Sequence, residues 1–202
     1  MIMNNGEGEI AVRIARKVVD AEASGKKTGH IDVPGTFREK RGAFVTLHTY
    51  PENNLRGCIG FPEPIFSLAS ALVRAAQHAC HDPRFPDLEE YELDNVTVEV
   101  SILTLPEEIM ASDPQSIIDA VRVGIDGLIV EHGQLRGLLL PQVPVEWGWD
   151  TKEYLAQICV KAGMSPDMWL DKYTRFYTFQ AEVFSEETPR GNVSRKEIGR
   201  CK

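Results

Sequence analysis

The sequence predicts an α+β fold of two lobes, built on mainly antiparallel sheets with helices packed on them. Three observations lead to this fold class. Segments rich in strand-forming residues alternate with segments whose apolar residues recur at helical spacing. Short polar turns join neighbouring strand segments into hairpins, and the strands of a hairpin are antiparallel. The order hairpin, helix and long strand occurs twice along the chain.

Two helices, one hairpin and one strand are expected in the first half. The first helix places Ile10, Ile14 and Val18 on one face and ends at Gly25. The strand from Asn95 alternates apolar and polar residues, which is typical of a half-buried strand. The expected elements are a helix over 9–23, a loop over 26–42, a strand over 43–47, a turn over 51–54, a strand from 55, a helix over 65–80, a loop over 82–86 and a strand over 95–103.

The second half of the chain follows the same order. Ser112, Asp113 and Pro114 are typical of the start of a helix, because serine and aspartate cap and proline fits the first turn. The polar residues 185–202 are expected to form a mobile tail. The other expected elements are a short helix up to 121, a hairpin of 127–131 and 135–140, a helix over 151–163, a short helix over 167–173 and a long strand over 175–184.

A repeated motif predicts an internal duplication of a hairpin–helix–strand unit. The residues L-R-G-C-I-G at Leu55 recur as L-R-G-L-L-L at Leu135. Each copy closes a hairpin, meets two prolines, enters a helix and ends in a long strand. We therefore expect one lobe over residues 1–105 and a second over 106–202, and either lobe can be discontinuous. Two copies at so long a period do not indicate a solenoid.

Composition excludes several classes of protein. The chain has 202 residues and a net charge of −8, which disfavours nucleic-acid binding because phosphate contacts need clustered cations. The first ten residues lack the basic and apolar regions of a secretory signal, and no apolar run is long enough to span a membrane. No C-x-x-C pair occurs, so reduced thiols and a cytoplasmic location are expected. The cysteines are Cys58, Cys80, Cys159 and Cys201.

The candidate site centres on Cys58. Side chains alternate between the faces of a strand, so Arg56 and Cys58 are expected on the same face. Because an arginine is seldom buried without a partner, this face is expected to contact solvent or to line a cleft. A cation about 7 Å from the sulfur stabilises the Cys58 thiolate by about 0.6 kcal/mol in water and by about 2.4 kcal/mol at an effective dielectric of 20. Arg56 alone therefore activates the thiol only modestly, and Arg84 is the candidate second cation. The alternative is a packing role, since Leu138 stands at the matching position of the second copy.

Other residues are candidates for ligand contact, each with a structural alternative. Gly57 and Gly60 fit close approach by a ligand or a β-bulge. Asp82 and Arg84 are candidate ligand contacts, and the alternative is that Arg84 pairs with a carboxylate such as Asp82. Three further polar residues can line the same cleft or lie on the surface, namely Glu99, Gln142 and Glu146.

Several motifs of other enzyme classes are missing. His78 and His81 share a helical face, but a structural zinc site needs four ligands and no partner pair follows at zinc-like spacing, so no metal is predicted. There is no phosphate-binding P-loop, no serine-hydrolase elbow and no dinucleotide fingerprint.

Six segments in order resemble the AMMECR family: LRGCIG, DPRF, VEVSIL, GIDGLIV, LLPQV and CVKAG. The resemblance runs from about Val12 to Phe184. It implies an α+β protein of two lobes with a cleft between them, and it identifies no reaction and no cofactor. It also implies a Memo-like protein and a radical-SAM protein as partners. The family's motif residues fall on 55–60, on 82–85, and on Pro141 and Gln142.

Two hypotheses of function stand. In the first, Arg56, Cys58 and Arg84 bind a small anionic ligand in the cleft, and the chain is a cysteine-dependent modification enzyme. Cys58 then acts as a nucleophile or thioester carrier, and Glu99 carries protons. In the second, the same cleft belongs to a non-catalytic binding or scaffold module that links partner proteins.

Overall fold

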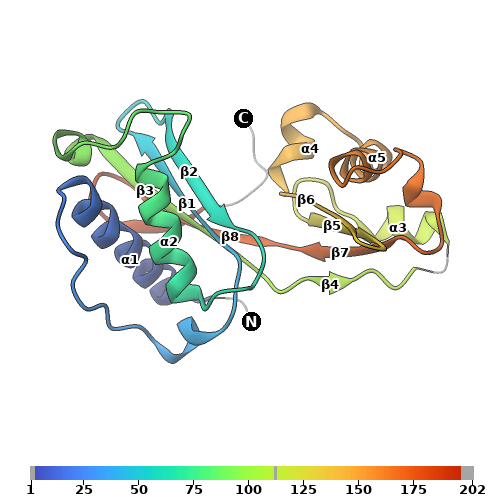
Figure 1. Cartoon of the computed structure of the whole chain (residues 1–202), viewed down its shortest axis with the longest axis horizontal. Helices are drawn as coiled ribbons and strands as arrows, with labels where there is room; N and C mark the ends of the chain where they lie inside the picture. Colours follow the sequence, from blue (N-terminus) through green and yellow to red (C-terminus); the bar gives the residue numbers. More distant parts are fainter. Residues whose placement is uncertain (1–2, 112, 197–202) are drawn as a thin grey trace. The chain divides into compact units, whose positions relative to one another are not determined.

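The computed structural model describes residues 3–111 and 113–196 (Figure 1). The chain divides into two units. Unit 1 contains the chain up to Thr104 together with Glu182–Lys196, and unit 2 contains Leu105–Ala181. Each unit combines helices with antiparallel strand pairs, so the predicted α+β class is confirmed. The predicted duplication and the lobes over 1–105 and 106–202 stay predictions.

Unit 1 is a five-stranded sheet in the order β2-β1-β3-β8-β9, with two long helices against one face. Figure 1 shows α1 and α2 side by side across this sheet. Alternate residues of β1 and β3 enter one core with the apolar faces of both helices. The elements are α1 (Asn5–Ala23), η1 (Gly35–Arg38), β1 (Ala43–Thr49), β2 (Leu55–Phe61), α2 (Leu68–Cys80), η2 (Glu90–Asn95), β3 (Val96–Leu103), β8 (Ala181–Glu186) and β9 (Val193–Lys196).

The face of this sheet turned away from the two helices is polar and half-buried. We call it the polar face; its central residues are Phe44, Thr46, His48, Cys58 and Glu99. Its composition follows from the period of two along each strand, because Val45 and Leu47 occupy the opposite, buried face.

Helix α1 begins earlier than residue 9 because Asn4 forms a capping box with Glu7. The same helix carries Arg16, which is 4% exposed and bonds to the Glu186 carboxylate on β8. Glu186 also accepts a bond of 3.1 Å from the Val98 amide of β3. A buried ion pair therefore ties the first helix to the last strands of the unit.

Unit 2 is a four-stranded sheet in the order β4-β7-β5-β6. Helix α5 packs on it, and Tyr154, Leu155 and Ile158 of this helix are fully buried. The Tyr154 hydroxyl donates to the Leu139 carbonyl of β6 and to the Asp126 carbonyl just before β5. The elements are β4 (Glu107–Glu108), α3 (Pro114–Ala120), β5 (Gly127–His132), β6 (Leu135–Leu139), α4 (Gln142–Trp147), α5 (Thr151–Lys161), η3 (Met168–Leu170) and β7 (Arg175–Phe179).

The C-terminal part differs from the prediction. The single strand expected over 175–184 is two strands, β7 and β8, which belong to different sheets. Residues 185–196, expected as a mobile tail, contain the end of β8 and all of β9. Polar residues predicted a mobile tail here, but they are held by contacts within unit 1. Arg195 of β9 binds the buried Glu182 carboxylate, which also accepts a hydrogen bond from the Met3 amide. The rest of the expected tail, and Ser112, lie outside the described residues.

In the part of the chain that the structure describes, no helix is both long and apolar enough to cross a bilayer.

Candidate functional site

Cys58 lies at one end of a short polar row that crosses three strands. It pairs with Thr46 of β1, and Thr46 pairs with Glu99 of β3. The Thr46 hydroxyl donates to the Cys58 Sγ at 3.2 Å. All three side chains are half-buried. The row therefore places a thiol, a hydroxyl and a carboxylate in sequence on the polar face.

His48 joins this row, although the sequence analysis did not select it. Its Nε2 lies 3.8 Å from Glu99 Oε1, and the two side chains are 19% and 24% exposed. Its Nδ1 is buried and has no hydrogen-bond partner within the described residues. Strand alternation alone identifies it, because His48 is two residues from Thr46 and so shares the polar face.

Arg56 lies at a β-bulge and is bound by Glu92, and its predicted projection on the same face as Cys58 stays a prediction. The pairing of β1 with β2 shifts between Leu47 and His48, which leaves Arg56 as the extra residue of a β-bulge. Arg56 Nε and Nη2 donate to the Glu92 carboxylate at 2.8 and 2.9 Å, and Nη2 also reaches the Asp87 carbonyl. These bonds raise the pKa of Arg56 and lower that of Glu92.

The Asp82–Arg84 loop covers the free edge of β2 beside Cys58. The Cys58 amide donates to Asp82 Oδ2 at 2.8 Å, and Arg84 Nη2 donates to the Cys58 carbonyl at 3.2 Å. Asp82 is 1% exposed, and the Arg84 side chain holds its pKa well below the usual range, helped by the amides of Cys58 and Arg84. The two motif segments thus bind each other, and the loop supplies the hydrogen bonds that an edge strand lacks.

Each guanidinium that was expected to hold an anion already has a carboxylate partner within unit 1. Glu92 binds Arg56, and Asp82 binds Arg84 through Nε and Nη2. Asp82 was itself a predicted ligand contact. Ligand binding by Arg56, Asp82 and Arg84 stays a prediction. Their observed contacts position β2, the strand that carries Cys58.

The glycines on either side of Cys58 have close neighbours in the protein itself. A Cβ on Gly57 would lie 2.3 Å from the Ala79 carbonyl oxygen, at the end of α2. A Cβ on Gly60 would lie 2.2 Å from the Phe44 ring. Both positions therefore require glycine for packing, and ligand contact by either stays a prediction.

Two predicted contacts belong to unit 2. Gln142 and Glu146 are exposed on α4. The neighbouring Trp147 is 70% exposed, and its ring stacks on that of Trp149 with the centroids 6.1 Å apart. Only Trp149 packs against the core of unit 2. The role of Gln142 and Glu146 in the site, and the cleft between lobes, stay predictions.

The other described thiols are buried. Burial raises the pKa of Cys80 to about 12 and that of Cys159 to about 11, which suppresses the reactive thiolate at neutral pH. His81 is engaged elsewhere, since it lies between Asp87 at 2.9 Å and Glu22 at 3.2 Å. Over residues 3–111 and 113–196, no three His, Cys, Asp or Glu side chains are grouped to hold a metal ion. Cys58 is thus the half-buried thiol among the three described.

Comparison with known proteins identifies the family. The AMMECR1 family model matches residues 12–184. Protein MJ0810 of Methanocaldococcus jannaschii is 53% identical over 193 residues, which cover 95% of this chain and 96% of that protein. The crystal structure of the uncharacterized protein PH0010 from Pyrococcus horikoshii is similar with a TM-score of 0.80 and 48% identity, covering 97% of this chain and 99% of that one. This chain therefore belongs to the AMMECR1 family.

Proposed function

We propose that this protein is a cysteine-dependent modification enzyme that carries an acyl group of a small substrate on Cys58. One observation carries the proposal: the thiol is half-buried, accepts a bond from Thr46 at 3.2 Å and lies in one row with Glu99. A hydroxyl donor at sulfur stabilises the negative charge of a thiolate nucleophile. The neighbouring His48 and Glu99, 3.8 Å apart, give the site an imidazole and a carboxylate, which are the side chains that most often act as general acids and bases.

The proposed step is acyl transfer to sulfur. The Cys58 sulfur attacks the carbonyl carbon of the substrate, and the thiol proton passes to the His48–Glu99 pair. The bond between that carbon and its leaving group then breaks, and the leaving group departs with the proton and the bonding electrons. Attack by a second nucleophile on the thioester reverses these steps and restores the thiol, so no oxidant or reductant is consumed.

Arg56 and Arg84 have a positioning role in this proposal. Exchanging Asp82 or Glu92 for an anionic substrate would leave a carboxylate without its cation, which is costly for the buried Asp82. The two arginines instead hold the bulge and the free edge of β2, which sets the direction of Cys58. An anionic ligand bound directly by these guanidiniums is the competing arrangement.

The proposal also places the protein in the cytoplasm, because a reduced thiol persists there. The partners that it carries over from the family resemblance are a Memo-like protein and a radical-SAM protein. A non-catalytic binding module remains the alternative function, and the following experiment separates the two.

The test is covalent labelling followed by intact-mass measurement. We incubate the folded protein with a small acyl thioester and expect one hydroxylamine-sensitive acyl group, located on Cys58 by peptide mapping. Thr46→Val, which keeps the shape but removes the hydroxyl, should slow labelling about tenfold. Cys58→Ser should abolish it, while Cys80 and Cys159 serve as unlabelled internal controls.

The binding-module alternative predicts a different pattern. Under that alternative, Cys58 in the folded protein acylates no faster than cysteine in an unfolded peptide of the same sequence. Glu99→Gln should then leave the labelling rate unchanged as well. Either result would overturn the enzyme proposal.

A further inference from the structure

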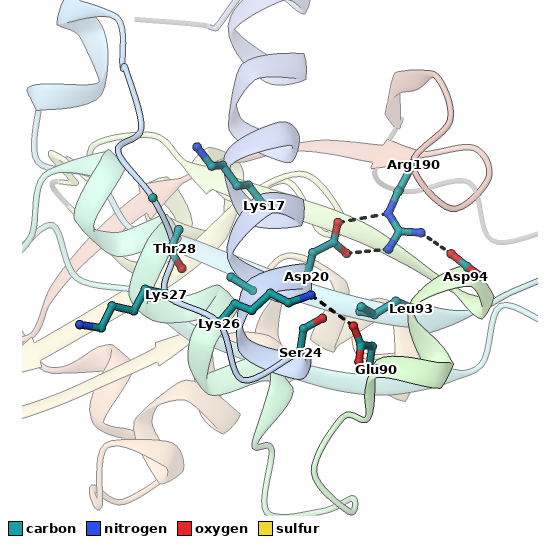
Figure 2. Close-up of a pocket in the computed structure, with 12 residues that line it drawn as sticks. Lys17, Asp20, Ser24, Lys26, Lys27, Thr28, Glu90, Leu93, Asp94 and Arg190 are labelled. Atoms are coloured by element: carbon teal, nitrogen blue, oxygen red, sulfur yellow. Dashed lines mark hydrogen bonds and ion pairs between the residues drawn. The ribbon is translucent and has the colours of Figure 1, made fainter.

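A second site is present in unit 1, away from Cys58. A hollow of about 470 Å³ lies between the last turns of α1, the loop that follows it, η2 and the turn between β8 and β9. Figure 2 shows the residues that line it. This volume is within the range of about 300–1,000 Å³ that holds small molecules. From the side chains and free amides around it, we propose that this hollow binds a phosphate-bearing small molecule. The proposal is independent of the proposed chemistry at Cys58.

The loop after α1 supplies hydrogen-bond donors. It reads Ser-Gly-Lys-Lys-Thr-Gly over residues 24–29, and Gly25 has a φ of 63°, which turns the chain away from the helix. Within the described residues, no hydrogen bond uses the backbone amides of Lys27, Thr28 and Gly29 or the Thr28 hydroxyl. Successive free amides beside a hydroxyl are a typical arrangement for binding an oxyanion.

Three lysines lie at this loop, two within it and one on α1. Among the described residues, Lys17 Nζ donates to the His30 carbonyl alone, at 2.8 Å. Lys27 has no ion-pair partner in the described part of the chain, and Figure 2 shows it and Lys17 extending outward from the wall. Lys26 reaches Glu90 at 3.5 Å, with the two side chains 71% and 66% exposed. So exposed a pair is weak, and all three flexible side chains are available to an incoming anion.

The opposite wall holds one cation between two carboxylates. Arg190 donates from Nε and Nη2 to Asp20 at 3.1 and 3.2 Å, and its Nη1 binds Asp94, as the dashed lines in Figure 2 mark. Arg190 offsets only one of these two negative charges, so the three lysines supply the excess of positive charge in the hollow. Four cationic side chains and three carboxylates line the hollow, so its local charge is positive although the protein's net charge is −8. The side chain of Leu93 gives the same wall an apolar patch.

These features together select the ligand class. Phosphate oxygens accept from amides, a hydroxyl and ammonium groups at once, and the remaining charge favours a dianion over a neutral molecule. Leu93 and Ala21 offer apolar surface to the organic part of a phosphate ester. A nucleic-acid chain needs a longer track of cations than three lysines provide.

The test is a calorimetric titration of the full chain with inorganic phosphate and with pyrophosphate at low ionic strength. We expect saturable binding at one site, with pyrophosphate binding more tightly because it offers more charge. The Lys17→Ala/Lys27→Ala chain should lose about tenfold or more in affinity. Thr28→Val, which changes no charge, should lose several-fold.

Two matched controls make the result specific. Lys152→Ala/Lys161→Ala removes the same charge from exposed positions of α5 and should leave the affinity unchanged. Cys58→Ser should also bind normally, so failure of the Cys58 proposal does not affect this one. Absence of saturable binding up to about 10 mM, or an equal loss in the α5 control, would overturn the proposal. Preference for a single-stranded oligonucleotide over pyrophosphate would overturn it too.

Discussion

Gly57 stands between Arg56 and Cys58, and no side chain fits at its position. The Ala79 carbonyl of α2 would lie 2.3 Å from an added Cβ, and it belongs to a helix backbone that cannot shift easily. We expect Gly57→Ala to lower the free energy of unfolding by about 2–4 kcal/mol. Urea denaturation monitored by circular dichroism measures this change.

Gly35→Ala is the matched control for this substitution. No atom lies within 4 Å of the added methyl group there. Its unfolding midpoint should stay close to that of the original chain. A Gly57→Ala chain as stable as Gly35→Ala would show that α2 does not press on β2 as described.

At this scale, the sequence placed Cys58 and Glu99 on the polar face, because strand alternation holds for β3 and for β2 beyond the bulge. It did not reveal the contact of Arg56 with Glu92, because the two residues are 36 positions apart in the chain. His48 was overlooked, although the same alternation places it beside Glu99.

At the scale of elements, a buried ion pair joins α1 to β8. Arg16 and Glu186 are 4% and 3% exposed, and Arg16 also donates to the Val96 carbonyl at 2.6 Å. We expect Arg16→Ala to destabilise the protein by about 3–5 kcal/mol, because the buried Glu186 charge keeps only the more distant Arg13, at 4.0 Å, as a cation. Chemical denaturation again provides the measurement.

The combined variant Arg16→Met/Glu186→Leu should recover much of this loss, since it removes both charges and keeps the volume. Arg175→Ala is the comparison, because Arg175 and Glu108 form an exposed pair worth at most about 1 kcal/mol. Equal effects of Arg16→Ala and Arg175→Ala would contradict the importance of the buried pair.

The Arg16–Glu186 pair shows why the bounds of some elements could be predicted from the sequence and those of others could not. Helices and strands with regular apolar periods, such as α2 and β3, were predicted close to their observed bounds. Strands β8 and β9 were not, because Glu182 and Glu186 are charged residues that are buried only through partners far away in the chain. Local patterning carries no signal of such partners.

At the scale of the whole molecule, the two sheets share an arrangement. Strand β1 pairs with both β2 and β3, and β5 pairs with both β6 and β7. Gly137 of the second L-R-G segment lies under α5, where an added Cβ would be 3.1 Å from the Ile158 carbonyl. This matches the position of Gly57 under α2. The internal duplication itself stays a prediction.

Unit 1 is closed by a segment from the far end of the chain. Strand β8 pairs beside β3, and Glu186 of this strand neutralises Arg16. A fragment of residues 1–104 therefore lacks two strands and leaves Arg16 buried without its carboxylate. We expect this fragment to be unfolded or aggregated, as judged by circular dichroism and size-exclusion chromatography, because the uncovered edge of β3 invites pairing between chains.

A second fragment tests whether residues 182–196 supply what is missing. Joining residues 1–104 to 182–196 through a short glycine-serine linker should give a monomer that unfolds cooperatively, since every strand of the sheet is then present. Glu186→Gln in the joined fragment should lower its stability, because the amide keeps the shape but not the charge that faces Arg16. If residues 1–104 fold equally well alone, the sheet does not need β8 and β9 for its stability. The description of unit 1 as a discontinuous folding unit would then be wrong.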